Sequence, residues 1–209
     1  FLGILVITNP NNLMIYHFLT GYNVVLASNS PRRQSLLKEA GIEFNIRTDV
    51  EIDESFPPTL RNEEVAMYLA SKKFKAYYPG IKKNDILITA DTIVCINNEI
   101  INKPADYNEA FSMIKKLSGN CHYVFTGVNI GNKEKQFSFF DCTEVYFTKL
   151  SVREIKYYVE NFSPYDKAGA YGIQEWIGYV GIEKINGSYY NVMGLPLHLL
   201  YKYLKEFEF

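Results

Sequence analysis

A single carboxylate inside an otherwise apolar stretch is the feature that most restricts how this chain can fold. Residues 86–96 read ILITADTIVCI, which predicts a buried β-strand with Asp91 near its middle. Removing an ionised carboxylate from water costs on the order of several kcal/mol unless a cation or hydrogen-bond donors compensate. Either a bulge opens the strand to a cleft that holds a metal ion or a lysine, or backbone N–H groups bond the carboxylate at a strand edge. The residues alone leave both interpretations open.

The rest of the chain alternates predicted strands with predicted helices. Asn97-Asn98 is typical of a hairpin turn into a short strand at 99–101, so at least one strand pair is antiparallel. Residues 166–194, rich in Gly and Tyr, are expected to form short strand-like pieces. The pattern indicates an α/β fold, a mixed β-sheet with flanking helices, and 209 residues suffice for one large domain or two small lobes around a cleft. Further strands are predicted at 24–27, 123–130 and 137–148, and helices at 31–40, 63–77, 106–117, 151–161 and 196–204.

The N-terminus and the charge balance argue against several classes of protein. Residues 1–7 are apolar, but TNPNN interrupts them and no Lys or Arg precedes Arg32, so we expect no signal peptide and no membrane span. A net charge of -1 provides no overall field for nucleic acid or an anionic membrane, so neither is an expected partner. The three cysteines form no CxxC pair, which fits a cytoplasmic protein. Residues 1–21 are predicted to be an N-terminal extension, with Met14 as a candidate native start, and residues 22–209 a single domain.

A polar segment, SNSPRR at 28–33, joins the first strand to the first helix. Ser30 suits an N-cap and Pro31 the first helical position, where free backbone N–H groups gather. Arg32 and Arg33 face the positive end of the helix dipole, which costs about 0.3–1 kcal/mol each unless an anion lies there. Because the arginine fork binds two oxygens at once, the segment indicates a phosphate site. The alternative is two solvated arginines balanced by carboxylates.

Three weaker features could serve an anionic ligand. Lys73 shares a helix side with apolar residues, so it either reaches a cleft or snorkels past the core, and Lys103 follows a strand. The loop at 49–58 offers Glu54 among several carboxylates, which suit Mg²⁺ or are simply solvated. Residues 166–174 place small residues around Gln174, whose amide suits a uracil-type edge, unless the segment is only a tight turn. Walker A, GxGxxG, GxSxG and HExxH motifs are absent from the sequence.

Five segments, in this order, resemble the Maf family of nucleotide pyrophosphatases, which is related in fold to inosine triphosphate pyrophosphatases. ASNSPRR at 27–33 resembles the opening signature of the family, and TADT at 89–92 its central one. NKP at 102–104 is similar to its GKP, with Asn in the Gly place. DKAGAYGIQ at 166–174 and YYNVMGLP at 189–196 match its C-terminal blocks. The resemblance covers about residues 22–204 and implies a Maf-type fold with two lobes around a cleft.

The resemblance also implies roles for individual residues. Asp91 would be the proton acceptor and, together with Glu54, would contact a divalent metal ion, Mg or Mn. The context of Gln174 is similar to the dTTP/UTP branch of the family, whereas Glu175-Trp176-Ile177 departs from the small residue common there and leaves the fine base preference open. The family is further expected to form homodimers. The triphosphate would be held by Ser28, Arg32, Arg33, Lys73 and Lys103, and the base would be discriminated by Arg32, Thr92 and Gln174.

The reaction implied is hydrolysis of dTTP, UTP or a modified pyrimidine NTP to NMP and pyrophosphate. Water would attack the α-phosphorus while Asp91 takes its proton and the cations neutralise the β- and γ-phosphates. The alternative is a non-catalytic nucleotide-binding regulator of cell division, which would need Arg32 and Arg33 but neither Asp91 nor a metal ion.

Overall fold

A computed structural model describes residues 16–208 of the chain. Met14 and most of the predicted N-terminal extension lie outside these residues, so both stay predictions. Within the described part, Phe18 of the 3-10 helix η1 (His17–Leu19) is buried in the main core. No helix of this part is long and apolar enough to cross a bilayer.

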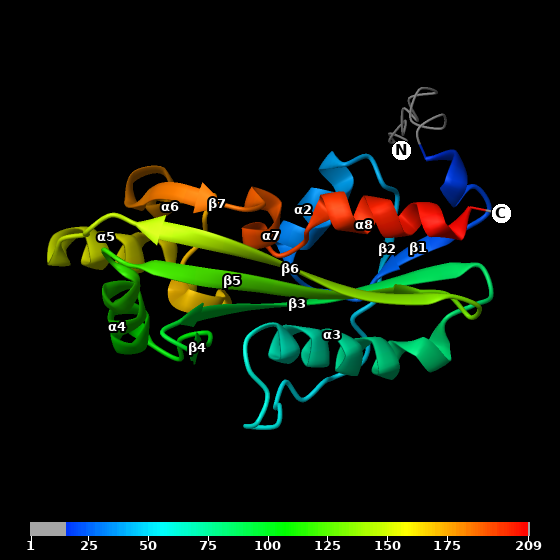
Figure 1. Ribbon diagram of the computed structural model, residues 1–209, viewed down its shortest axis with the longest axis horizontal. Helices are drawn as coiled ribbons and strands as arrows, with labels where there is room; N and C mark the ends of the chain where they lie inside the picture. The colour runs from blue at the N-terminus through cyan, green and yellow to red at the C-terminus, as the bar shows by residue number, and fades with distance from the viewer. Residues whose placement is uncertain (1–15, 209) are drawn as a thin grey trace, which may run out of the picture.

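One mixed seven-stranded sheet runs through the molecule in the order β2-β1-β3-β5-β6-β7, with β4 also paired to β3 (Figure 1). β1 is parallel to β2 and β3, and the remaining pairs are antiparallel. Asn97 and Asn98 both have positive φ, which confirms the predicted hairpin turn between β3 and β4. The strands are β1 (Asn23–Leu26), β2 (Asn45–Ile46), β3 (Asp85–Ile96), β4 (Glu99–Ile101), β5 (Cys121–Gly131), β6 (Gln136–Phe147) and β7 (Ile182–Asn186).

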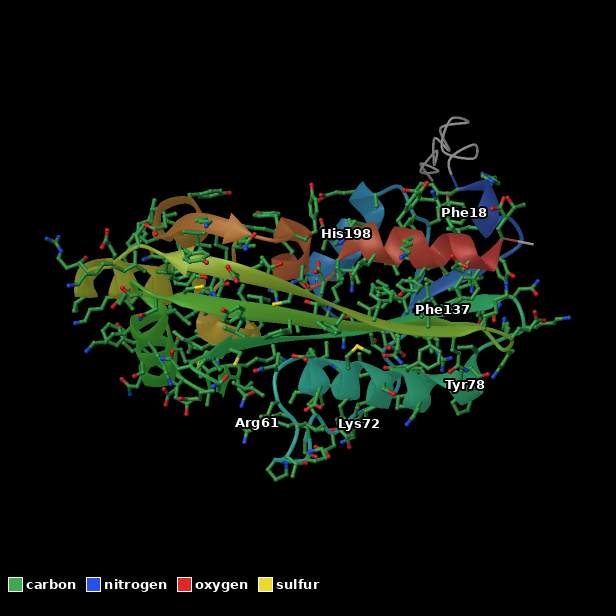
Figure 2. The ribbon with its side chains drawn as sticks, in the orientation of Figure 1. Phe18, Arg61, Lys72, Tyr78, Phe137 and His198 are labelled. Atoms are coloured by element: carbon green, nitrogen blue, oxygen red, sulfur yellow. The ribbon has the colours of Figure 1, made fainter. Side chains whose placement is uncertain are left out.

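Helices cover both faces of the sheet, with α3 on one face and α8 on the other, while α4, α5 and α6 gather at one end (Figure 1). Phe137 of β6 packs against Tyr203 and Phe207 of the C-terminal helices (Figure 2). The predicted α/β class, a mixed β-sheet with flanking helices, is confirmed. The helices are α2 (Pro31–Glu39), α3 (Glu63–Tyr77), α4 (Tyr107–Leu117), α5 (Val152–Phe162), α6 (Trp176–Gly181), α7 (Tyr189–Met193) and α8 (Leu197–Leu204), with 3-10 helices η2 (Tyr78–Gly80), η3 (Pro164–Asp166), η4 (Ala168–Ala170) and η5 (Lys205–Phe207).

The close approach of α3 to the sheet depends on Gly127 of β5. A Cβ atom at this position would lie 2.5 Å from the backbone carbonyl carbon of Ala66, so only glycine lets the α3 backbone lie directly against the strand. In the β3–β5 ladder Gly127 stands opposite Asp91. The same contact therefore holds α3 beside the isolated carboxylate.

The expectation of several short strand-like pieces in residues 166–194 is confirmed for one strand only. The segment contains η3, η4, α6 and α7 and only one strand, β7. Gly169 and Ala170 adopt positive φ values of 73° and 58°, which break any extended run at this point. The two-residue strand β2 was not predicted, because so short a strand shows no alternation.

Candidate active site

A cavity opens where β3 lacks a neighbouring strand on one side. β1 pairs with β3 as far as Ile88, and β4 pairs with it only from Val94 onward. Between them, on the side away from β5, one stretch of β3 borders no strand. β3 keeps an unbroken register with β5 through Asp91, so no bulge opens the strand, but the compensating lysine of that interpretation is present as Lys73. The cleft exists because β1 is short, and it flanks Asp91 as the isolated carboxylate requires.

A cavity of about 440 Å³ fills this gap and collects nearly all the predicted site residues. Gln174 is the exception, because it is exposed and does not line the cavity. Its role in base discrimination stays a prediction. The predicted residues that line the cavity are Ser28, Arg32, Arg33, Glu54, Lys73, Asp91, Thr92 and Lys103.

Asp91 and Glu54 converge on the ammonium group of Lys73. Lys73 Nζ lies 2.5 Å from Asp91 Oδ1 and 2.7 Å from Glu54 Oε1, and Lys103 Nζ lies 3.3 Å from Glu54 Oε2. The side chains of Lys73 and Asp91 are only 14% and 12% exposed, so Lys73 ends in the cavity and does not snorkel to the surface. Burial raises the pKa of Glu54, but its hydrogen bond to Lys73 and the charges of both lysines outweigh this, so its pKa is lowered.

Arg33 is held from three directions by neutral groups. Its Nε donates to the carbonyl of Gly194 at 2.8 Å, its Nη2 to Thr92 Oγ1 at 3.0 Å, and its Nη1 to Ser28 Oγ at 3.3 Å. Burial lowers the pKa of Arg33, and the negative charge of Asp91 across the cavity opposes this change. An arginine stays protonated in such a setting, so it presents a fixed positive charge.

A second ion network, which the sequence did not reveal, lies at the same cavity and is centred on Asp166. Arg32 Nη1 contacts Asp166 Oδ2 at 2.9 Å, and Lys167 Nζ lies 2.7 Å from Asp166 Oδ1 and 3.1 Å from Glu175 Oε1. Lys167 lines the cavity and is 9% exposed. The only sequence signal was the Asp-Lys pair within the segment 166–174, and its charges alone did not distinguish it from a surface turn.

The carboxylates suit a divalent metal ion. Asp91 and Glu54 already bracket one cation, the Lys73 ammonium, and Mg²⁺ is usually held by one or two carboxylates with phosphate oxygens and water. Within residues 16–208 there is no cluster of three or more His, Cys, Asp or Glu that could hold a metal ion. Asp91 and Glu54 would therefore hold the ion only in company with substrate oxygens.

The fold and the cavity define an α/β protein whose cavity brings several basic side chains together with a carboxylate. A protein-family model described as "Maf-like protein" matches residues 23–207, and the chain belongs to this family. Its relatives include the "dTTP/UTP pyrophosphatase" of Parabacteroides distasonis, 50% identical over 90% of this chain and 98% of the relative. Proteins of the same name from Bacteroides fragilis and Porphyromonas gingivalis are 47% and 48% identical, over 90% of this chain and 97% and 96% of theirs.

Proposed function

We propose that this chain is a nucleoside triphosphate pyrophosphatase that converts dTTP and UTP, or modified pyrimidine counterparts, to NMP and pyrophosphate with a divalent metal ion. Relatives of nearly the same length that carry the name dTTP/UTP pyrophosphatase support the substrate class. The observation that carries the proposal is that Asp91 lines the same cavity as Arg32 and Arg33. A polyphosphate gripped by the arginines therefore lies beside a carboxylate.

In the proposed reaction, a water oxygen bonds to the α-phosphorus as the bond from that phosphorus to the α,β-bridging oxygen breaks. Asp91 accepts the proton of the water, and pyrophosphate leaves with the bridging oxygen. Lys73 orients Asp91, while Arg33 and Lys103 neutralise charge on the departing phosphates. A divalent ion held by Asp91 and Glu54 would supply further charge neutralisation when bound.

The test is release of pyrophosphate from dTTP, UTP, CTP and 7-methyl-GTP, with and without Mg²⁺. Asp91→Asn should lower kcat by about 10²–10⁴-fold, the usual contribution of a positioned general base, while nucleotide binding stays measurable. Asp85→Asn is the matched control, because Asp85 lies on the same strand, is equally buried and is remote from the cavity. Turnover by Asp91→Asn at the level of Asp85→Asn would reject the role of Asp91. Nucleotide binding by the wild-type chain without any pyrophosphate release would instead favour the non-catalytic regulator.

We also propose that the chain acts as a homodimer in the cytoplasm, as expected from the family resemblance. Light scattering coupled to size-exclusion chromatography tests the oligomeric state directly. A monomer at micromolar concentration would reject the dimer without bearing on the proposed reaction.

A further inference from the structure

A chain of hydroxyl groups leads from Arg33 into the core. Arg33 Nη2 lies 3.0 Å from Thr92 Oγ1, which lies 3.0 Å from Thr126 Oγ1, which in turn lies 3.0 Å from the carbonyl oxygen of Asn191. Thr126 is fully buried and does not line the cavity. It can therefore act on a ligand only through another residue.

The two ends of this chain fix the direction of every hydrogen bond in it. The Arg33 guanidinium can only donate, and the carbonyl of Asn191 can only accept. Thr126 has one hydroxyl proton and must give it to Asn191, so its oxygen accepts the proton of Thr92. The oxygen of Thr92 in turn accepts from Arg33. The hydroxyl proton of Thr92 is thus committed to Thr126 and is not free for a ligand in the cavity.

The acceptor end is itself held rigidly. Asn191 is fully buried, and its Nδ2 donates to the carbonyl of Val124 and to Thr143 Oγ1, both at 3.0 Å. These bonds attach α7 to β5 and β6. Three residues after Asn191, the carbonyl of Gly194 accepts directly from Arg33 Nε at 2.8 Å. Arg33 is therefore connected to the α7 segment by two routes. One is its direct hydrogen bond to Gly194, and the other runs through the two threonines to Asn191.

We propose that Thr126 is a positioning residue that orients the Arg33 guanidinium through Thr92. The inference rests on the proposed function, in which Arg33 grips the phosphates. Because phosphates are common to all nucleotides, Thr126 should contribute to affinity for the triphosphate whichever base it carries.

The test is steady-state kinetics of Thr126→Val with dTTP, UTP and CTP. We expect KM to rise by about three- to tenfold, the range for loss of one neutral hydrogen bond, by the same factor for all three nucleotides. KM should change more than kcat, because Arg33 already grips the triphosphate in the ground state, while its role at the departing phosphates allows some fall in kcat. Thr126→Ser, which keeps the hydroxyl, should restore the wild-type KM. Thr92→Val, which breaks the same hydrogen-bonded series, should also raise KM.

Thr89→Val is the matched control. Thr89 is also fully buried in the sheet, and its hydroxyl donates to the carbonyl of Ala70 at 2.8 Å, outside the threonine chain. The Thr89→Val variant should be less stable than the wild type but should show no rise in KM. An unchanged KM in Thr126→Val would overturn the proposal, as would KM factors that differ between the three bases.

Failure of the proposed function can be distinguished from failure of this inference. If the wild-type chain releases no pyrophosphate from any of the nucleotides, the function is refuted, and calorimetry with inorganic tripolyphosphate replaces the kinetics. Weaker binding by Thr126→Val than by Thr126→Ser would then still support the threonine chain. Equal binding by the two variants would reject it.

Discussion

Replacing Lys73 with methionine should leave the carboxylates of Asp91 and Glu54 facing each other without the ammonium between them, while Lys103 still contacts Glu54 from its other side. Asp91 Oδ1 and Glu54 Oε1 lie 2.5 Å and 2.7 Å from the same nitrogen, and therefore within about 5 Å of each other. At an effective dielectric constant of about 20, two negative charges at that separation repel by about 3 kcal/mol. The side chain of Glu54 is 48% exposed, so solvent reduces this repulsion to about 1–2 kcal/mol.

Loss of the buried contact to Asp91 adds to this repulsion. Removing one partner of a buried ion pair costs about 3–5 kcal/mol, and for a chain of this size about 3 kcal/mol corresponds to a fall in Tm of about 6–12 °C. The pKa of Glu54 is lowered in the wild type, so the stabilisation from Lys73 is present at neutral pH and is lost as pH falls below the ordinary glutamate value of about 4.3. The difference between wild type and Lys73→Met should accordingly begin to shrink only below about pH 4.3, as pH falls toward the lowered pKa of Glu54.

Lys72→Met is the control for thermal melts at pH 7 and pH 4, with and without MgCl₂. Lys72 is the preceding residue of α3, on the side turned away from the sheet (Figure 2), and its partner Asp53 is 71% exposed, so its loss should cost less than about 1 kcal/mol. Mg²⁺ should stabilise Lys73→Met more than the wild type, because it then binds between two carboxylates freed of their ammonium. Equal losses for the two variants, with no difference in Mg²⁺ response, would refute the central role given to Lys73.

Two further substitutions test the close contact between α3 and the sheet and the titration of a buried histidine. Gly127→Ala should lower the free energy of unfolding by about 1–3 kcal/mol and displace Lys73 from Asp91, because the new methyl group would collide with the α3 backbone. Denaturant melts measure the first effect and pyrophosphate release the second. Unchanged activity would show that turnover does not depend on the spacing between α3 and the sheet. Burial lowers the pKa of His122 to about 4 while the unfolded chain titrates near 6.5, so stability should fall by about 3 kcal/mol as pH drops from 6.5 to 4. His122→Phe cannot titrate and should flatten that part of the stability curve; an unaltered curve would assign the acid sensitivity to other groups.

Local patterns in the sequence were sufficient for the regular elements. The helix predicted at 63–77 is α3 without change, and the helix predicted at 151–161 is α5, which begins with a capping box formed by Ser151 and Glu154. Both depend on residues three or four apart, which the sequence displays directly. Likewise, the conflict between Asp91 and its apolar neighbours identified the strand that borders the cavity, because the cost of burying a charge is a local property.

Features set by distant partners could not be predicted in this way. The opening beside Asp91 arises because β1 has four residues and β3 has twelve, and neither strand displays which part of the other it pairs with. Thr126 lies in an ordinary apolar strand, and only the register between β3 and β5, which sets Thr126 opposite Thr92, reveals their contact. The left-handed conformation of Ala170 likewise has no signature in an alanine.

The alternation of β3 explains how an acidic residue and an arginine can serve one cavity without neutralising each other. Asp91 shares its face with Ile93 and Cys95, which pack under α3, whereas Thr92 shares its face with residues that pack toward α2 and α7. On a fully paired strand these faces would be separated by the sheet, but the absent neighbour lets both reach the same space. Asp91 is then balanced by Lys73, and Arg33 is held only by neutral oxygens. A direct pair between Asp91 and Arg33 would occupy the proposed proton acceptor and the proposed phosphate ligand at once, and placing them on opposite faces of β3 keeps both available for the proposed reaction.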